Sequence, residues 1–180
     1  MKNVKNFSLV IAMLISFLSF GQEINEKNKF KVREFFILNK EYENYYDIIK
    51  SNGFKKVSDT SFTLSNSGYR LTQIKKKSKT IILFSKINLK YEKDEANESL
   101  TLLDTLQIDS LDETNFVIIG YCELDGLLPE QIISLVKKCK KEYLDVIIKS
   151  WKVNEKTMKI EKINDASKIK CINEHFEYSE

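Results

Sequence analysis

The sequence is poor in residues that interrupt regular structure: its 180 residues include one proline and five glycines. Clusters of these residues mark linkers and low-complexity chains, so their scarcity beside 42% hydrophobic residues predicts a folded chain. The glycines form neither G-x-x-x-x-G-K-[ST] nor G-x-G-x-x-G, the loops that cradle phosphates, and no G-x-S-x-G elbow occurs. The motifs of nucleotide-binding proteins and serine hydrolases are therefore absent.

Histidine occurs once, as His175. A Ser-His-Asp or Cys-His mechanism would have to use it, but it lies near the end of the sequence, where chains are usually mobile, and no known catalytic motif surrounds it. One histidine and three scattered cysteines form no C-x-x-C or H-E-x-x-H pattern, so we expect no zinc site. The sequence predicts no catalytic residue, no metal and no cofactor.

Acidic residues form two groups, but neither has the ligand spacing or central glycine of an EF-hand loop. We interpret both groups as solvated loops, with adventitious calcium binding and a glycosidase-like carboxylate pair as alternatives. The groups are Glu92, Asp94, Glu95 and Glu98, and Asp109, Asp112 and Glu113.

A strong charge of one sign is also lacking. The net charge is +3, and removing Lys2 and Lys5 leaves 27 basic against 26 acidic residues. Nucleic-acid binders carry a strongly basic domain or face, so nucleic acid is not an expected partner. The densest basic run, lysines 75–77 and 79, is interpreted as a hairpin tip kept soluble by charge, with binding of anionic glycans or lipid headgroups as the alternative.

One long apolar run is present, at residues 7–20, and it follows the basic residues Lys2 and Lys5. It ends in Ser19-Phe20-Gly21, which puts small residues where signal peptidase requires them. We predict a signal peptide at 1–21, cleaved between Gly21 and Gln22, with an uncleaved anchor as the alternative. The mature protein would be a single periplasmic or secreted domain at 22–180, mobile at 22–29 and 174–180 and without stable membrane insertion.

Export makes a disulfide possible between two of the three cysteines. Cys139 falls in step with a helical apolar stripe, where a thiol acts as a small buried hydrophobe. Cys122 follows a strand-like run and Cys171 lies in the tail, so their positions favour the pair Cys122–Cys171. Three free thiols are the alternative.

Hydrophobic periodicity predicts a helix at 31–52, ended by Ser51-Asn52-Gly53; the alternative is a strand at 30–37 and a helix capped by Asn39. Strand patterns follow at 54–58, 62–64, 69–74, 80–84, 87–91, 100–108 and 115–123, with a bulge near Ser85.

Pro129 and an apolar stripe from Ile132 to Trp151 predict a second helix at 129–151. The alternative makes 131–136 a strand paired with 115–123 and followed by a shorter helix. A turn then leads into a strand that ends near Ile163. These elements predict an α+β fold, in which an N-terminal helix and a long C-terminal-half helix pack on an antiparallel sheet of five to seven strands.

Four segments of the C-terminal half resemble a group of small exported bacterial proteins that are themselves uncharacterised. The resemblance covers residues 100–175 and implies that Cys122 and Cys171 belong together, but it implies no activity. It also leads us to expect a glycine where this chain has Met158. The segments are Gly120-Tyr121-Cys122-Glu123-Leu124-Asp125-Gly126, Ile132–Lys137, Ile148–Val153 and Ile169–Glu174.

Two triplets match the Asp-Ser/Thr-aliphatic acceptor of some O-glycosylation systems for exported proteins. They are Asp104-Thr105-Leu106 and Asp109-Ser110-Leu111, which make Thr105 and Ser110 candidate glycosylation sites.

The leading functional hypothesis is a non-enzymatic module that binds a protein or another component of the cell envelope. Tyr42, Tyr45, Tyr46 and Trp151 could form an aromatic binding surface, although a helical stripe would place most of them in the core, with Tyr46 the exception. The alternatives are an envelope hydrolase that uses paired carboxylates, an inhibitor of such an enzyme, and a structural envelope protein.

The export prediction is tested by the intact mass of the protein from its host, measured with thiol alkylation before and after reduction. We expect a chain that begins at Gln22, with one alkylated cysteine before reduction and three after. Hexose-sized increments would indicate glycosylation. A full-length mass with three reactive thiols would contradict both export and the disulfide.

Overall fold

The computed structural model describes residues 35–92, 95–109, 111–127, 129, 131–174 and 176, and leaves the side chains of Glu92 and Glu95 out. The predicted signal peptide, Asp94, Ser110 and His175 lie outside these residues. The chain divides into two compact units, 1–35 and 36–180, and all described residues except Phe35 belong to the second. The second unit is described below.

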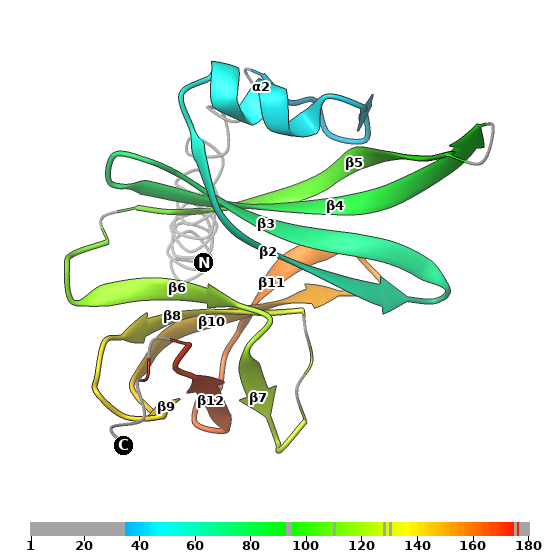
Figure 1. Ribbon diagram of the computed structural model, residues 1–180. Coiled ribbons are helices and arrows are strands. Elements are labelled where there is room, and N and C mark those ends of the chain that lie inside the picture. Colours follow the sequence, from blue (N-terminus) through cyan, green and yellow to red (C-terminus); the bar gives the residue numbers. More distant parts are fainter. Residues whose placement is uncertain are drawn as a thin grey trace, which may run out of the picture. The chain divides into compact units, whose positions relative to one another are not determined.

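Antiparallel strands dominate this unit, and the described residues contain one helix, α2 (Tyr45–Ser51). The predicted α+β fold with a long C-terminal-half helix is therefore wrong (Figure 1). In the described part of the chain, twelve strands form three sheets instead of one sheet of five to seven strands.

Sheet A has five strands in the order β1-β5-β4-β3-β2. Two-residue turns join β2 to β3 and β3 to β4. In the first turn Ser65 and Asn66 both have positive φ, as a type I′ hairpin turn requires. The predicted bulge near Ser85 is confirmed by a register shift between Phe84 and Ser85. The strands are β1 (Glu41–Tyr42), β2 (Lys55–Leu64), β3 (Ser67–Lys76), β4 (Lys79–Glu92) and β5 (Glu95–Ile108).

Sheets B and C are built from the C-terminal half of the chain. Sheet B has the order β11-β10-β8-β6, and sheet C has the order β7-β12-β9. Sheet B contains β6 (Asn115–Ile119), β8 (Ile132–Lys137), β10 (Ile147–Asn154) and β11 (Lys159–Ile163). Sheet C contains β7 (Cys122–Leu124), β9 (Tyr143–Leu144) and β12 (Ile169–Ile172).

These elements stack as four layers: α2, sheet A, sheet B and sheet C (Figure 1). One core cluster lies between sheets A and B and includes Leu71, Phe84, Ile119 and Ile133. A second core cluster lies between sheets B and C and includes Ile118, Ile132, Val136, Leu144 and Ile169. The centre of sheet B, at β6 and β8, is therefore buried on both faces.

The predicted helix at 129–151 is wrong because its apolar stripe is divided among β8, β9, β10 and the segments between them. A strand that is covered on both faces reads as a continuous apolar run, which periodicity does not distinguish from a buried helix. Ile132, Ile133 and Val136 are all fully buried in β8. The alternative strand at 131–136 is confirmed by the pairing of β8 with β6, but the shorter helix after it is not.

The predicted helix at 31–52 is wrong over most of its described part, because only Tyr45–Ser51 is helical. The predicted stop is confirmed, since Asn52 is the C-cap and Gly53 has a φ of 74°. Asn39 does not cap a helix. It has a φ of 63°, and its backbone N–H donates to the Leu102 carbonyl oxygen of β5, which ties this segment to sheet A before β1.

The cysteine pair Cys122–Cys171 is present as a disulfide, and the two residues face each other in the register of β7 and β12. Cys139 is the free cysteine, but the prediction that it lies on a helix is wrong. It lies between β8 and β9. At Met158, where the resemblance led us to expect glycine, φ is 53°, a conformation that glycine adopts without cost.

Gly120 joins β6 of sheet B to β7 of sheet C at a φ of 81°, and a Cβ there would lie 2.8 Å from Oγ1 of Thr60 on β2. We expect Gly120→Ala to lower the free energy of unfolding by about 1 kcal/mol for the left-handed backbone and by about 1–3 kcal/mol more for overpacking. Gly126→Ala is the matched control, because Gly126 has a φ of 77° and open space around it. Urea unfolding measures both, and equal losses would contradict the close packing of β2 on this bend.

Candidate binding surface

Three hollows surround α2 and the adjoining part of sheet A. The first, of 540 Å³, lies at the C-terminal end of α2 and is lined by Tyr46, Ile49, Lys50 and Gly53–Lys56. The second, of 590 Å³, lies at the other end of the helix and is lined by Lys40–Asn44, Ile48 and Lys90. The third, of 350 Å³, is lined by Glu43, Lys90 and Asn97–Ser99. We call α2 and these hollows the α2 face.

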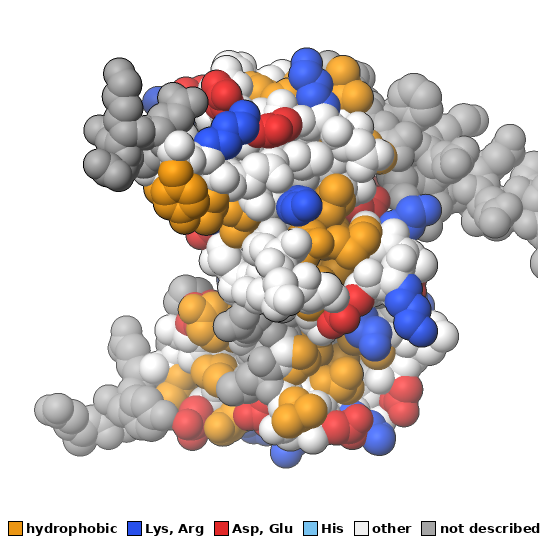
Figure 2. All heavy atoms as spheres, turned by 90° about the vertical axis from the view of Figure 1, so that its right-hand side faces the viewer, with side chains coloured by type: hydrophobic (Ala, Val, Ile, Leu, Met, Phe, Trp, Pro, Cys, Tyr) orange, Lys and Arg blue, Asp and Glu red, His pale blue; other side chains and the backbone are white. Residues whose placement is uncertain are grey.

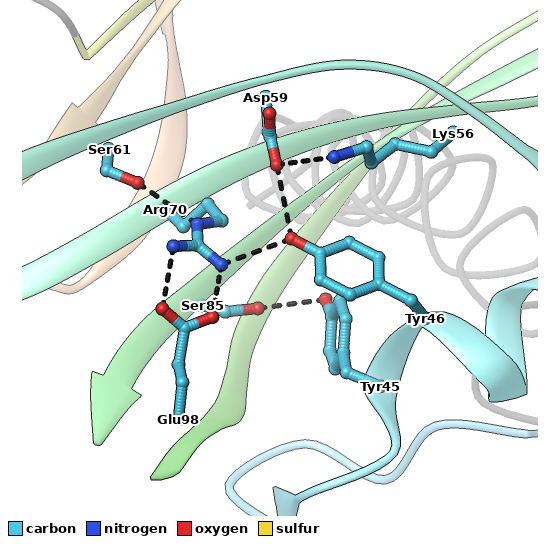
Figure 3. A network of polar contacts seen from close by, with 8 residues as sticks. All are labelled: Tyr45, Tyr46, Lys56, Asp59, Ser61, Arg70, Ser85 and Glu98. Carbon is cyan, nitrogen blue, oxygen red and sulfur yellow. Dashed lines mark hydrogen bonds and ion pairs between the residues drawn. The ribbon is translucent and has the colours of Figure 1, made fainter. Parts of the chain in front are cut away.

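Arg70 on β3 is at the centre of a polar network on this face (Figure 3). Its guanidinium binds both carboxylate oxygens of Glu98 on β5, with an Nη2–Oε2 distance of 2.8 Å. Its Nε donates to Ser61 Oγ at 3.0 Å, and its Nη1 donates to Tyr46 Oη at 3.1 Å. The side chains of Arg70 and Glu98 are 15% and 36% exposed. Bidentate pairs of this kind fix geometry, so Arg70 holds one strand on each side of it and the helix together.

The network continues from the helix to β2 (Figure 3). The Tyr46 hydroxyl donates to Asp59 Oδ2 at 3.1 Å, and Lys56 Nζ lies 3.0 Å from the same oxygen. The Lys56 ammonium also lies 4.9 Å from the centre of the Tyr46 ring. Partial burial raises the pKa of Asp59, but Lys56 and Tyr46 outweigh this effect and the pKa lies below its usual range. The carboxylate therefore contributes stability above about pH 4, which is lost as the pH falls through the lowered pKa.

The neighbouring Tyr45 anchors α2 from its buried side. Its hydroxyl shares a hydrogen bond of 2.9 Å with Ser85 Oγ on β4, and its ring stacks on that of Phe36. Burial raises the pKa of Tyr45 well above its ordinary value. The prediction that Tyr46 would be the exposed tyrosine agrees with its 36% exposure, since Tyr42 and Tyr45 are buried.

The other polar cluster of the α2 face lies where β1 meets β5. Ser99 donates to the Glu41 carboxylate, and Lys90 Nζ lies 3.0 Å from the same carboxylate group. These two contacts lower the pKa of Glu41. Like the Arg70 network, this cluster joins separate strands through charges that are already paired.

Six described carboxyl groups have a pKa below its usual range. For every one except Asp59, a side-chain hydrogen bond is the largest cause. A glycosidase-type general acid needs the opposite shift, because it must hold a proton near neutral pH. These carboxyl groups are arranged as hydrogen-bond acceptors. They are Glu41, Asp59, Asp112, Asp145, Glu161 and Asp165.

Three carboxylates of the two acidic groups accept hydrogen bonds from separate neighbours. Glu98 pairs with Arg70, Asp109 accepts from Gln107, and Asp112 accepts from Thr114. Among the described residues, no three His, Cys, Asp or Glu side chains lie together as metal ligands would.

Of the two candidate glycosylation sites, the described one is Thr105. It is 6% exposed on β5 and pairs with Leu83 on β4, so a transferase could reach it only before folding. Trp151 also does not contribute to an aromatic surface, because it is partly buried against the core between sheets A and B.

Sequence reasoning missed Arg70, Asp59 and Glu98 as a group, because they come from three strands whose pairing was not known. One signal was available. Arg70 is one of only two arginines in a chain that otherwise uses lysine, and it lies within a strand pattern. Arginine suits bidentate contacts that lysine cannot make.

No protein-family model, curated protein or solved structure matches this chain. Within the described residues, no helix has both the length and the apolar character needed to cross a membrane.

Replacing Arg70 with lysine should weaken the attachment of α2 to sheet A. Lysine keeps the positive charge but lacks the planar guanidinium that binds Glu98, Ser61 and Tyr46 together. We expect Arg70→Lys to lower the free energy of unfolding by about 1–2 kcal/mol, a value reduced by the partial exposure of the pair, and to speed amide hydrogen exchange in α2. The control is Ser61→Ala, which removes one hydrogen bond. Unchanged exchange in α2 would show that Arg70 does not hold the helix.

Proposed function

We propose that this chain is an exported, non-enzymatic binding module of the cell envelope and that the α2 face is its recognition surface. The observation that carries the proposal is the Arg70 network, which fixes one helix and strands β2, β3 and β5 beside three surface hollows. Binding surfaces gain affinity when side chains are held in place before the partner arrives.

The disulfide supports an exported location, because disulfides persist in oxidising compartments. The apolar run and cleavage pattern of the first 21 residues point the same way. The paired carboxylates with lowered pKa support recognition more than acid catalysis, since they accept hydrogen bonds from their neighbours instead of holding a proton.

A photo-crosslinking amino acid at single positions in the producing host tests this proposal. We expect discrete adducts from Lys50, which lines the first hollow, and from Asn97, which lines the third. Lys156, exposed in the turn between β10 and β11, is the matched control and should give none. Adducts from Lys156 alone, or none from any position in a protein that is folded and exported, would contradict the proposal.

A further inference from the structure

The end of α2, the start of β2 and the turn from β3 to β4 lie at one end of sheet A (Figure 1). These segments contain seven lysines. Strand register brings them together, since Lys55 pairs with Lys75 and Lys76 pairs with Lys79. We call this set the lysine end. It consists of Lys50, Lys55, Lys56, Lys75, Lys76, Lys77 and Lys79.

Most of the lysine end has no described carboxylate beside it. Lys56 pairs with Asp59, and Lys76 donates to the Asn52 carbonyl oxygen. No ion pair within the described residues involves the other five. Asp109 follows the end of β5 that pairs with the start of β4, but its carboxylate accepts from Gln107. Six of the seven lysines are exposed, and Lys79 is partly buried. Their charges are therefore available to an external anion.

The first hollow opens within the lysine end and is apolar in character. Tyr46, Ile49 and Phe54 form part of its lining, and Lys50, Lys55 and Lys56 stand at its rim. Two ammonium groups lie over its rings: Lys56 over Tyr46, and Lys76 over Phe54 at 5.4 Å from the ring centre. Its 540 Å³ falls within the range of about 300–1,000 Å³ that is typical of small-molecule sites.

The geometry points to the lysine end as a docking site for a bilayer of anionic phospholipid. Five unpaired ammonium groups, distributed over the end of one helix and three strands, suit an extended anionic surface better than a single anion. The apolar hollow provides space for apolar groups of the bilayer surface. A purely hydrophilic glycan would leave the hollow empty. This inference rests on the proposed function, because it names the envelope component that part of the α2 face meets.

Figure 2 shows the face of the molecule on the right-hand side of Figure 1, opposite the end of sheet A at which β3 turns into β4. On this face, basic, acidic and apolar side chains alternate without a large area of one charge. The exposed Leu89 and Tyr91 belong to the part of the β4–β5 hairpin that extends beyond β3, and nothing in the structure shows what covers them. The unpaired charge of the lysine end therefore distinguishes it as the docking site.

Co-sedimentation with vesicles tests the inference, using the full chain as its host produces it. We expect binding to vesicles of phosphatidylglycerol and phosphatidylcholine at about 3:7, weak binding to phosphatidylcholine alone, and loss of binding as salt rises from about 0.1 M to 1 M. Lys55→Gln, Lys75→Gln, Lys77→Gln and Lys79→Gln combined should weaken binding by at least about tenfold.

The matched control has the same net charge as this variant but removes lysines of sheets B and C and their loops. It combines Lys138→Gln, Lys140→Gln, Lys149→Gln and Lys170→Gln, all exposed and none in a described ion pair. The control should bind as the parent does. Equal weakening in both variants would show that net charge alone drives binding and would overturn the inference, as would no binding by the parent.

A second variant, Phe54→Ser, tests the hollow. It should weaken binding at about 0.1 M salt and leave the dependence of binding on salt unchanged, because it removes apolar contact but no charge. Melting temperature and near-ultraviolet circular dichroism check that each variant is folded. Failure of vesicle binding with adducts still formed at Lys50 and Asn97 would reject the lipid and keep the binding module, whereas failure of both experiments would reject the proposed function itself.

Discussion

The architecture depends on the burial of the centre of sheet B, at β6 and β8, on both faces. Its inward side chains alternate between two cores, so that Ile133 packs towards sheet A while Ile132 and Val136 pack towards sheet C. Polar side chains that are buried between two layers need hydrogen-bond partners within the protein. Ser134 and Ser150 provide them for each other, with a hydrogen bond of 2.8 Å where β8 pairs with β10. Sheet C is small, and its disulfide joins the two strands that close this second core. Sheet A can then bury one face on sheet B and use the other for α2.

Double burial hides the alternation of a strand, and the sequence was interpreted correctly only where a second signal was present. In sheet A, Ile81–Phe84 of β4 are buried without alternation, but the charged tip at 75–79 indicated the β3–β4 hairpin and the change of phase near Ser85 indicated the bulge. In sheet B, Ile132, Ile133 and Val136 of β8 are also buried without alternation, and the spacings from Ile132 to Trp151 match a helix by chance. The length of the run favoured a helix. No glycine or proline separates its strands, so no residue indicated the turns between them. No sequence pattern from Lys138 to Val146 indicated the turns or the two-residue strand β9 in this segment.

The candidate surface was predictable only in part. Tyr46 could be separated from Tyr42 and Tyr45 because it falls beside the apolar stripe, and that distinction does not need a long helix. The lysine run at 75–77 and 79 was visible as a hairpin tip, but Lys50 and Lys55 join it only through the register of β2 with β3 and the end of α2. Arg70 and Glu98 are 28 residues apart and come together across β4. Contacts of this kind follow from topology, which composition and periodicity do not supply.

Amide hydrogen exchange, resolved along residues 129–154, tests the double burial of sheet B most directly. The account predicts that the paired amides of β8 exchange only through global unfolding, at the slowest rates in the domain, because β8 is central in its sheet and has a core on each side. The segment between β8 and β10 should exchange faster. Uniform protection from 131 to 151 with helical chemical shifts, or β8 amides that exchange as fast as those of the exposed end of the β4–β5 hairpin, would contradict it.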